Sequence, residues 1–381
     1  MRHQRGLLAI CGIFLIVSAC APGAAPKVSP SSASSAGISP SSSAISADAI
    51  SAVDAMLADM TSGSVFSGSV LISQHGHVLL SKGYGFADRA QKTPNGPQTR
   101  FGIGSNTKQF TAAAILLLEV RGKLKVTDLI CKYIADCPSA WGVITIKELL
   151  THSSGIPDYV NTVPDFVAYA GPPLTPPQVI AHFRDLPLEF VPGTTWKYSN
   201  SGYFLLGYII EQVSGLSYEA FLQKNILTPL KLSDTGYNHN SNGVAIGYAD
   251  GYSTPAEQWD PWLPYAAGAL YSTVEDMNRW EQALTTDALL PAASRAEMFA
   301  IQMAITAPAA PPMSAGYGYG FMIGTDSGRP IIWHNGGISG FSSIEARYPV
   351  DDVTVIILGN QENADVSTIL EGISAKIFNT G

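Results

Sequence analysis

The stretch that decides the fold is Phe-Gly-Ile-Gly-Ser-Asn-Thr-Lys at residues 101–108, followed by an apolar segment to Val120. Apolar residues recur there at helical spacing, which predicts a helix over residues 105–120. Ser105 and Lys108 share one face of that helix, so the amine can approach the hydroxyl. A serine attacks only after a base removes its proton, and a lysine serves as that base when burial and nearby cations lower its pKa. The alternative is a serine that caps the helix and a lysine on the surface.

Tyr198 and Asn200 form a second candidate group, in a loop before a predicted helix over residues 201–213. A phenol can pass a proton between a nucleophile and a leaving group, and an amide can bind the carbonyl region of an ester or amide. The pattern Tyr-x-Asn is weak alone, because Tyr-Val-Asn at residues 159–161 also matches it. We interpret that second copy as a coincidence within a loop.

The third group is His334-Asn335-Gly336-Gly337, which follows a predicted strand over residues 331–333. Gly336 and Gly337 would let a substrate lie close along that strand edge. The backbone N–H of Gly337 could join that of Ser105 in an oxyanion hole, a pair of donors that stabilises negative charge on a carbonyl oxygen. His334, taken alone, could equally be a polar residue at the end of a strand.

Hydrophobic patterning places strands near both ends of the folded part and helices between them. A hairpin is predicted over residues 68–72 and 77–82, three successive strands over 331–333, 342–348 and 353–358, and a closing helix over 365–378. This order predicts an α+β domain whose antiparallel sheet combines both ends of the chain and is flanked by helices. The mostly helical middle is expected to form a second lobe.

The ordered set Ser-x-x-Lys, Tyr-x-Asn and His-x-Gly resembles the serine β-lactamase and penicillin-recognising family. The similar branch contains class C β-lactamases, D-alanyl-D-alanine carboxypeptidases and family VIII carboxylesterases. The segments at residues 101–105, 149–155, 198–203 and 267–273 resemble that family as well, and the resemblance extends over roughly residues 50–380. It implies a β-lactamase/transpeptidase-like fold.

Position by position, the resemblance implies that Ser105 is the acylated nucleophile and Lys108 its proton acceptor. Tyr198 would shuttle protons, Asn200 would orient the substrate, and Gly337 would supply the second oxyanion donor. The chain departs from the related set Ser-x-x-Lys, Ser-Asp-Asn and Lys-Thr-Gly at the second and third motifs. No metal and no cofactor is implied.

His334 occupies the position where many relatives carry lysine. A histidine with an ordinary pKa near 6.5 is mostly neutral at pH 7.5 and offers a carboxylate less charge than lysine does. We therefore expect uncharged short-chain esters to be better substrates than anionic β-lactams. Activity on substrates that carry a carboxylate is expected to rise as the pH falls from 8 toward 6.

Composition and missing motifs exclude several other classes. Of 381 residues, 46% are apolar, which is too many for a disordered protein, and a net charge of −8 without basic runs argues against nucleic-acid binding. A zinc-peptidase motif His-Glu-x-x-His and an α/β-hydrolase motif Gly-x-Ser-x-Gly are both missing. We interpret His75 and His77 as solvated side chains rather than metal ligands, and His152 as a structural hydrogen-bonding residue.

The first 47 residues are expected to lie outside the folded domain. Arg2 and Arg5 precede an apolar run that ends at Cys20 and is too short to span a bilayer, so residues 1–20 are predicted to be a signal peptide.

Val-Ser-Ala-Cys at residues 17–20 resembles the lipobox of bacterial lipoproteins. The resemblance implies a lipid on Cys20 and a periplasmic protein anchored at the inner face of the outer membrane; the alternative is ordinary cleavage near residues 24–25. Residues 21–47, rich in serine, alanine and proline, are predicted to be a flexible tether, and residues 48–381 the hydrolase domain.

Cys131 and Cys137 are the only cysteines outside the predicted signal peptide. An oxidising compartment permits a disulfide between them, and the short spacer can close one. The alternative is two free thiols. A zinc site is disfavoured, because no histidine pattern nearby supplies further ligands.

The sequence thus predicts a serine hydrolase that acts through an acyl-enzyme on esters or amides, as an esterase or a D-Ala-D-Ala-type peptidase. A β-lactamase is the alternative enzyme, and a non-catalytic peptidoglycan-binding lipoprotein is the alternative outside enzymes. The expected partners are a small-molecule ester, peptide or β-lactam substrate and a membrane reached through the lipid anchor. No nucleic acid is expected, and the number of subunits is not predicted.

Overall fold

The computed structural model describes residues 44–162, 174–239, 243–249, 252–257, 262–306 and 311–378. The predicted signal peptide, its Cys20 and nearly all of the predicted tether lie outside these residues. Helix α1 (Ala47–Ser62) is the first described element, and the side chain of Ser46 caps it by accepting a hydrogen bond from the Ala49 N–H at 3.1 Å.

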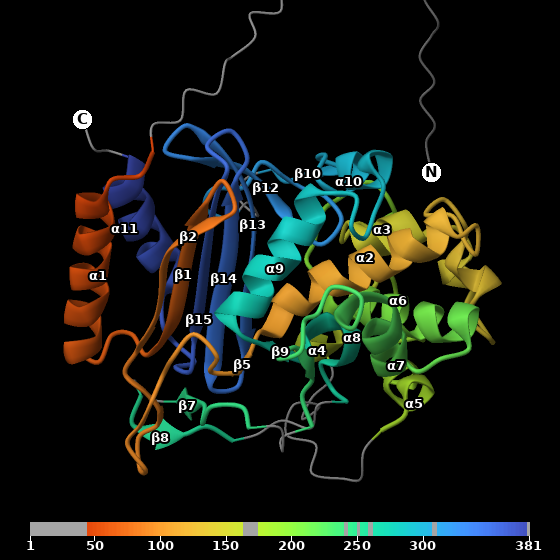
Figure 1. The fold of residues 1–381 in the computed structure, drawn as a ribbon. Coiled ribbons are helices and arrows are strands. Elements are labelled where there is room, and N and C mark those ends of the chain that lie inside the picture. Colours follow the sequence, from red (N-terminus) through yellow and green to blue (C-terminus); the bar gives the residue numbers. More distant parts are fainter. Residues whose placement is uncertain are drawn as a thin grey trace, which may run out of the picture. The chain divides into compact units, whose positions relative to one another are not determined.

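One eight-stranded antiparallel sheet has the strand order β10-β11-β12-β13-β14-β15-β1-β2 (Figure 1). The first strand of the chain, β1, pairs with the last strand, β15, along their whole lengths. The prediction that the sheet combines both ends of the chain is therefore confirmed. The strands are β1 (Gly68–Gln74), β2 (His77–Tyr84), β10 (Met303–Ala304), β11 (Gly316–Tyr317), β12 (Met322–Asp326), β13 (Arg329–Ile338), β14 (Phe341–Tyr348) and β15 (Val353–Gly359).

Helices cover both faces of this sheet, so its central strands are buried on both sides. Helices α1 and α11 (Val366–Phe378) lie on one face and α9 (Val274–Thr285) on the other (Figure 1). Successive side chains of a strand point to opposite faces. In β15, Val355 and Ile357 accordingly join the core that contains α1 and α11, whereas Ile356 and Leu358 join the core that contains α2.

The second lobe is mostly helical and surrounds α2 (Thr107–Val120), which is buried from its first residue to Leu118. The ring of Phe110 stacks on that of Trp280, with centroids 4.1 Å apart, and so ties α2 to α9. None of the described helices is long and apolar enough to cross a bilayer. The remaining helices are α3 (Ile146–Leu150), α4 (Tyr159–Thr162), α5 (Pro176–Ala181), α6 (Asn200–Ser214), α7 (Tyr218–Leu222), α8 (Tyr265–Gly268) and α10 (Ala292–Met298).

Short elements connect the two lobes. Strands β5 (Phe101–Gly102), β9 (Leu270–Ser272) and β6 (Gly236–Tyr237) form a small sheet in that order. The hairpins are β3 (Phe86–Asp88) with β4 (Thr93–Pro94) and β7 (Tyr248–Ala249) with β8 (Thr254–Pro255). The 3-10 helices are Gly104–Asn106, Ile130–Lys132 and Ser139–Trp141, and a π-helix, Gln223–Leu227, continues α7. A disulfide joins Cys131 to Cys137, with Cα atoms 5.3 Å apart.

Two local predictions differ from the structure near the motifs. Residues 104–106 form a 3-10 turn before α2, so the regular helix begins at Thr107 rather than at residue 105. Strand β13 extends to Ile338 because it pairs with β14 as far as the Ile338–Phe341 turn. The residues predicted to follow a strand, 334–337, therefore lie inside it.

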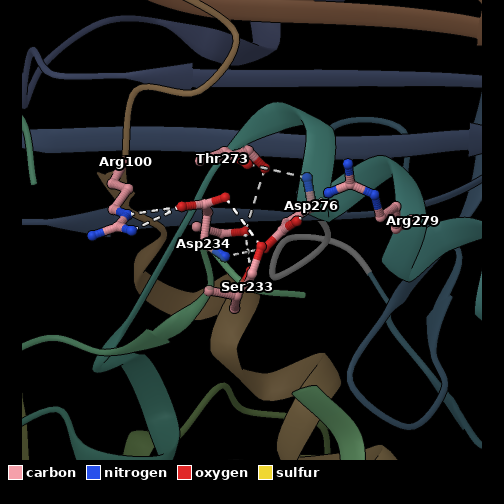
Figure 2. A network of polar contacts seen from close by, with 8 residues as sticks. Arg100, Ser233, Asp234, Thr273, Asp276 and Arg279 are labelled. Atoms are coloured by element: carbon pink, nitrogen blue, oxygen red, sulfur yellow. Dashed lines mark hydrogen bonds and ion pairs between the residues drawn. The ribbon is translucent and has the colours of Figure 1, made fainter. Parts of the chain in front are cut away.

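A polar network centred on the buried carboxylate of Asp276 fixes the entry to the nucleophile segment (Figure 2). Arg100, directly before β5, forms an ion pair with Asp234 at 2.8 Å. The backbone N–H of Asp234 donates to Asp276 at 2.7 Å, and Thr273 caps α9 by accepting from the Asp276 N–H at 3.1 Å. Arg279 pairs with the other oxygen of Asp276. This network joins β5, the start of α9 and the segment after the π-helix, and so sets where the chain enters residues 103–108.

Candidate active site

Two glycines, Gly104 and Gly336, allow the turn that carries Ser105 to touch strand β13. Gly104 has φ +49°, and a Cβ there would lie 2.8 Å from the backbone nitrogen of Gly337. A Cβ on Gly336 would lie 2.0 Å from the carbonyl oxygen of Ile103, whereas one on Gly337 would meet nothing within 4 Å. Gly336 was predicted to make room for substrate. The structure corrects this, because the space beside Gly336 is filled by the chain that leads to Ser105.

The hydroxyl of Ser343 on β14 fastens this turn to the sheet. Its single hydrogen is donated to the carbonyl oxygen of Ile103 at 2.9 Å, and the carbonyl oxygen of Gly336 lies 3.3 Å away. The hydroxyl also accepts a hydrogen bond from Asn106 Nδ2 at 2.8 Å. Since Ser105 lies between Ile103 and Asn106, its position relative to β13 is set by contacts on both sides.

The side chains of the first two motifs meet at one oxygen atom. Ser105 Oγ lies 3.0 Å from Lys108 Nζ and 2.8 Å from the hydroxyl of Tyr198. Lys108 Nζ also donates to Asn200 Oδ1 at 2.9 Å and to the carbonyl oxygen of Ala267 at 2.8 Å. The four predicted site residues Ser105, Lys108, Tyr198 and Asn200 thus form one cluster, although Ser105 and Tyr198 are 93 positions apart in the sequence.

Burial sets the protonation states in this cluster. Lys108 is 0% exposed, and desolvation lowers its pKa to about 7, partly opposed by the negative charge of Asp158. Desolvation also raises the pKa of Tyr198 above its ordinary value, although its hydrogen bond with Ser105 lowers it. At neutral pH a large fraction of Lys108 is therefore an uncharged amine, while Tyr198 keeps its proton. Lys108 is the group that can accept a proton, and Tyr198 the one that can give one.

His334 is buried behind this cluster, and both ring nitrogens are engaged. Nδ1 lies 2.5 Å from the carbonyl oxygen of Asn335, which only accepts, so it carries the hydrogen in the neutral ring. Nε2, 3.0 Å from the hydroxyl of Tyr317, then accepts from it. Desolvation, together with the charge of Lys108, lowers the pKa of His334 to about 3. The expectation that His334 meets a substrate carboxylate, as the lysine of relatives would, is therefore wrong for this arrangement, since no N–H of the ring is left for a substrate.

His152 lies in the same buried wall, beside Tyr198. Its Nδ1 accepts a hydrogen bond from the Ser199 N–H at 3.2 Å, and its ring centroid lies 4.3 Å from that of Tyr198 and 4.6 Å from that of Tyr317. Desolvation and, after it, the charge of Lys108 hold the pKa of His152 well below its ordinary value. His152 is thus a neutral ring that supports the backbone and the phenol of the Tyr198 motif.

A pocket of ≈ 130 Å³ opens beside Ser105, and its walls are mainly apolar. The hydroxyl of Tyr159 donates to the carbonyl oxygen of Leu263, so the aromatic ring rather than a free hydroxyl contributes to the lining. The copy of Tyr-x-Asn at residues 159–161 was interpreted as a coincidence, yet its tyrosine lines the site. The full lining is Ser105, Tyr159, Val160, Asn200, Leu263, Pro264, Ala267, Gly268, Gly337 and Ile338.

Asp158, like Tyr317, belongs to the site but was missed by the sequence patterns. It is 6% exposed, and its Oδ2 accepts a hydrogen bond from Asn200 Nδ2 at 3.0 Å. It follows the family-like segment at residues 149–155 by three positions, which is the only hint that the sequence contains. Within the described ranges, no group of three or more His, Cys, Asp and Glu side chains is placed to hold a metal ion.

Comparison with known proteins agrees with this geometry. A family model described as Beta-lactamase matches residues 52–373. The putative penicillin-binding protein PbpX of Bacillus subtilis is 31% identical over 304 residues, which cover 78% of this chain and 71% of that protein. Protein flp of Staphylococcus aureus is 30% identical over 331 residues, which cover 84% of this chain but only 65% of flp.

A solved structure shows the same architecture. The octameric penicillin-binding protein homologue from Pyrococcus abyssi superposes with a TM-score of 0.76 and 28% sequence identity. The match covers 87% of this chain and 77% of that one.

Proposed function

This chain belongs to the beta-lactamase family, with the β-lactamase/transpeptidase-like fold that its motifs predicted, and we propose that it is a serine hydrolase that cleaves esters or amides through an acyl-enzyme. The observation that carries the proposal is the contact of one oxygen, Ser105 Oγ, with both Lys108 Nζ and the Tyr198 hydroxyl. A protein that only binds peptidoglycan would need no such convergence. The intact cluster therefore supports an enzyme over the binding-protein alternative.

Acylation begins at the neutral amine of Lys108. Such an amine has two N–H groups and one lone pair, and two fixed oxygens, of Asn200 and Ala267, accept the two N–H groups. The lone pair then points at Ser105 Oγ and takes its proton as the oxygen attacks the substrate carbonyl. The negative charge that forms on the carbonyl oxygen is stabilised by the backbone N–H groups of Ser105 and Gly337.

Tyr198 completes the proton transfers. Its hydroxyl gives a proton to the leaving oxygen or nitrogen, and the proton that Lys108 took from Ser105 then replaces it. The bond from the carbonyl carbon to the leaving atom breaks as the ester with Ser105 forms. A water molecule attacks that ester in the second half, and its proton follows the reverse route, which restores Ser105.

The pocket favours uncharged substrates with a short apolar acyl group. Apart from Asn200 and Ser105, its side chains are apolar or, in Tyr159, already hydrogen bonded, and none is charged. Its ≈ 130 Å³ is similar to an engineered apolar cavity of roughly 150 Å³ that binds benzene. These features favour an esterase or amidase over a β-lactamase, whose substrates carry a carboxylate.

The periplasmic location and the anchor at Cys20 are likewise proposals, supported by the lipobox-like residues 17–20. We propose that the mature chain is tethered at the inner face of the outer membrane through that cysteine.

The proposed activity is tested by labelling and turnover on the same protein. A fluorophosphonate probe and a fluorescent penicillin are each incubated with the enzyme, followed by assays with p-nitrophenyl acetate, p-nitrophenyl butyrate and nitrocefin. We expect covalent labelling of Ser105 by the fluorophosphonate and a higher kcat/KM for the esters than for nitrocefin. Faster nitrocefin hydrolysis would favour the β-lactamase, and the lack of any labelling or turnover would favour the binding protein.

A further inference from the structure

Asn200 has an amide whose two ends meet opposite kinds of partner. Its Oδ1 accepts a hydrogen bond from Lys108 Nζ at 2.9 Å, and its Nδ2 donates to Asp158 Oδ2 at 3.0 Å. Asp158 is itself held in place, because its Oδ1 accepts from the backbone N–H of Val160 at 3.2 Å. Ser105, Lys108, Asn200 and Asp158 thus form a continuous chain of hydrogen bonds.

The carboxylate determines which way the amide points. If the amide of Asn200 were rotated by half a turn, its NH₂ would face the amine of Lys108 and its oxygen would face the carboxylate of Asp158. The first pair would be two donors and the second two acceptors, so neither hydrogen bond would form. An unmade hydrogen bond of a buried polar group is costly, and more so for a charged group.

We propose that Asp158 is a positioning residue for catalysis, which holds the Asn200 amide so that its oxygen accepts an N–H from Lys108 and the lysine lone pair is directed at Ser105. The inference rests on the proposed function and extends it to a residue outside the three motifs. Asp158 acts through Asn200 and does not touch the reacting atoms.

A second effect of Asp158 is electrostatic. Its negative charge favours the protonated form of Lys108 and so opposes the desolvation that lowers the lysine pKa. Burial raises the pKa of Asp158 itself, whereas Lys108, Asn200 and the Val160 N–H act in the other direction. The titratable groups that face Lys108 or Asp158 from the surrounding elements are His152, Tyr159, Tyr198, Tyr203 and His334. The histidines and tyrosines of this set are neutral at pH 7. Asp158 is therefore the residue among them that supplies a negative charge to Lys108.

The two effects predict distinct results in two variants. Asp158→Asn keeps the shape and one acceptor oxygen, which can serve Asn200 but not also the Val160 N–H, and it removes the charge. The acid limb of kcat/KM against pH should therefore move to lower pH. Asp158→Ala removes the acceptor, so kcat should fall by roughly 10- to 100-fold through misplacement of the reacting groups, with a smaller change in KM. Asp185→Asn is the matched control, because Asp185 is exposed and pairs only at 3.7 Å with Arg184; its profile should equal that of the wild type.

A double-mutant cycle separates positioning from general damage to the fold. If Asp158 acts through Asn200, then Asp158→Ala should cost little further kcat in an Asn200→Ala background. Additive losses in this cycle would overturn the positioning role, and an acid limb that does not move in Asp158→Asn would overturn the electrostatic effect. The fluorophosphonate labelling of wild-type Ser105 tests the proposed function separately, since it does not depend on either Asp158 variant.

Discussion

The hydroxyl of Tyr317 lies 3.0 Å from Nε2 of His334, and both rings are buried. This contact, with that of Nδ1 to the Asn335 carbonyl oxygen, uses the whole hydrogen-bonding capacity of a neutral imidazole. The third motif thus supports the wall behind Tyr198, and it does not present a cation to the substrate.

The pH dependence of activity follows from this contact. Because the pKa of His334 is lowered to about 3, it stays neutral from pH 5 to 9, and activity on carboxylate substrates should not rise as the pH falls from 8 toward 6. Loss of the neutral amine of Lys108, whose pKa is about 7, should instead reduce kcat/KM for all substrates together below neutral pH. The measurement is kcat/KM for p-nitrophenyl butyrate and nitrocefin across this range. We expect the ratio of the two kcat/KM values to stay constant. A ratio that shifts toward nitrocefin at pH 6 would instead show that a protonated His334 contacts the substrate carboxylate.

The nucleophile and its base are expected to act as one unit. Ser105→Ala and Lys108→Met should each lower kcat by at least roughly 1,000-fold, and the double variant should be little worse, since groups of one catalytic unit are not additive. Lys123→Ala, an exposed lysine beyond the end of α2, is the control and should retain wild-type turnover. Intact-mass analysis should show a fluorophosphonate adduct on the control and none on Ser105→Ala.

The two glycines of the third motif should differ in their effect on stability. Gly336→Ala places a methyl group 2.0 Å from the Ile103 carbonyl oxygen, so the backbone must move, at a cost of about 1–3 kcal/mol in the free energy of unfolding. Gly337→Ala meets nothing within 4 Å and should leave that free energy unchanged. Urea unfolding of both variants checks the difference, and equal stabilities would contradict the close approach of β13 to the Ser105 turn.

A buried carboxyl beneath α2 makes stability depend on pH. Glu345 on β14 is 1% exposed, and Gln109 Nε2 donates to its Oε2 at 2.5 Å. Desolvation and the neighbouring charge of Glu281 raise the pKa of Glu345 well above its ordinary value. The folded state therefore keeps a proton that the unfolded chain loses, so this stabilisation is complete below about pH 4.5 and is lost as the pH rises.

Glu345→Gln tests that linkage, because the amide has a similar shape and does not titrate. The melting temperature of the variant should rise relative to that of the wild type between pH 5 and 8. The slope of the difference in unfolding free energy should be at most about 1.4 kcal/mol per pH unit, the value for one proton. Parallel curves for the two proteins would show that Glu345 is ionised in the folded state.

The proposed anchor is tested by metabolic labelling with a palmitate analogue. The wild type should be labelled and Cys20→Ala should not, because only the lipobox cysteine receives the acyl chain. Cys11→Ala is the matched control, since it changes the other cysteine of the same apolar run and should keep the label. An unlabelled wild type that leaves the cell in soluble form would favour cleavage near residues 24–25.

Local patterns in the sequence were sufficient for the elements and for the motifs. The spacing of apolar residues located the hairpin, the three late strands and the closing helix, and the order of Ser105, Lys108, Tyr198 and His334 indicated the family. These features depend on neighbours along the chain, such as the shared helix face of Ser105 and Lys108. Helix α1 was missed because its serine- and alanine-rich start resembles the tether that precedes it.

The tertiary structure alone decided what each motif residue touches. Whether His334 meets substrate or Tyr317, and whether Gly336 meets substrate or Ile103, depends on how β13 packs against segments far away in the chain. The same holds for Asp158, which no motif includes, and for the pKa of Lys108, which is lowered only because distant segments bury it. Hydrophobic periodicity encodes which side of an element is inside, but hydrogen bonding and desolvation depend on the atoms that meet there, and these come from every part of the chain.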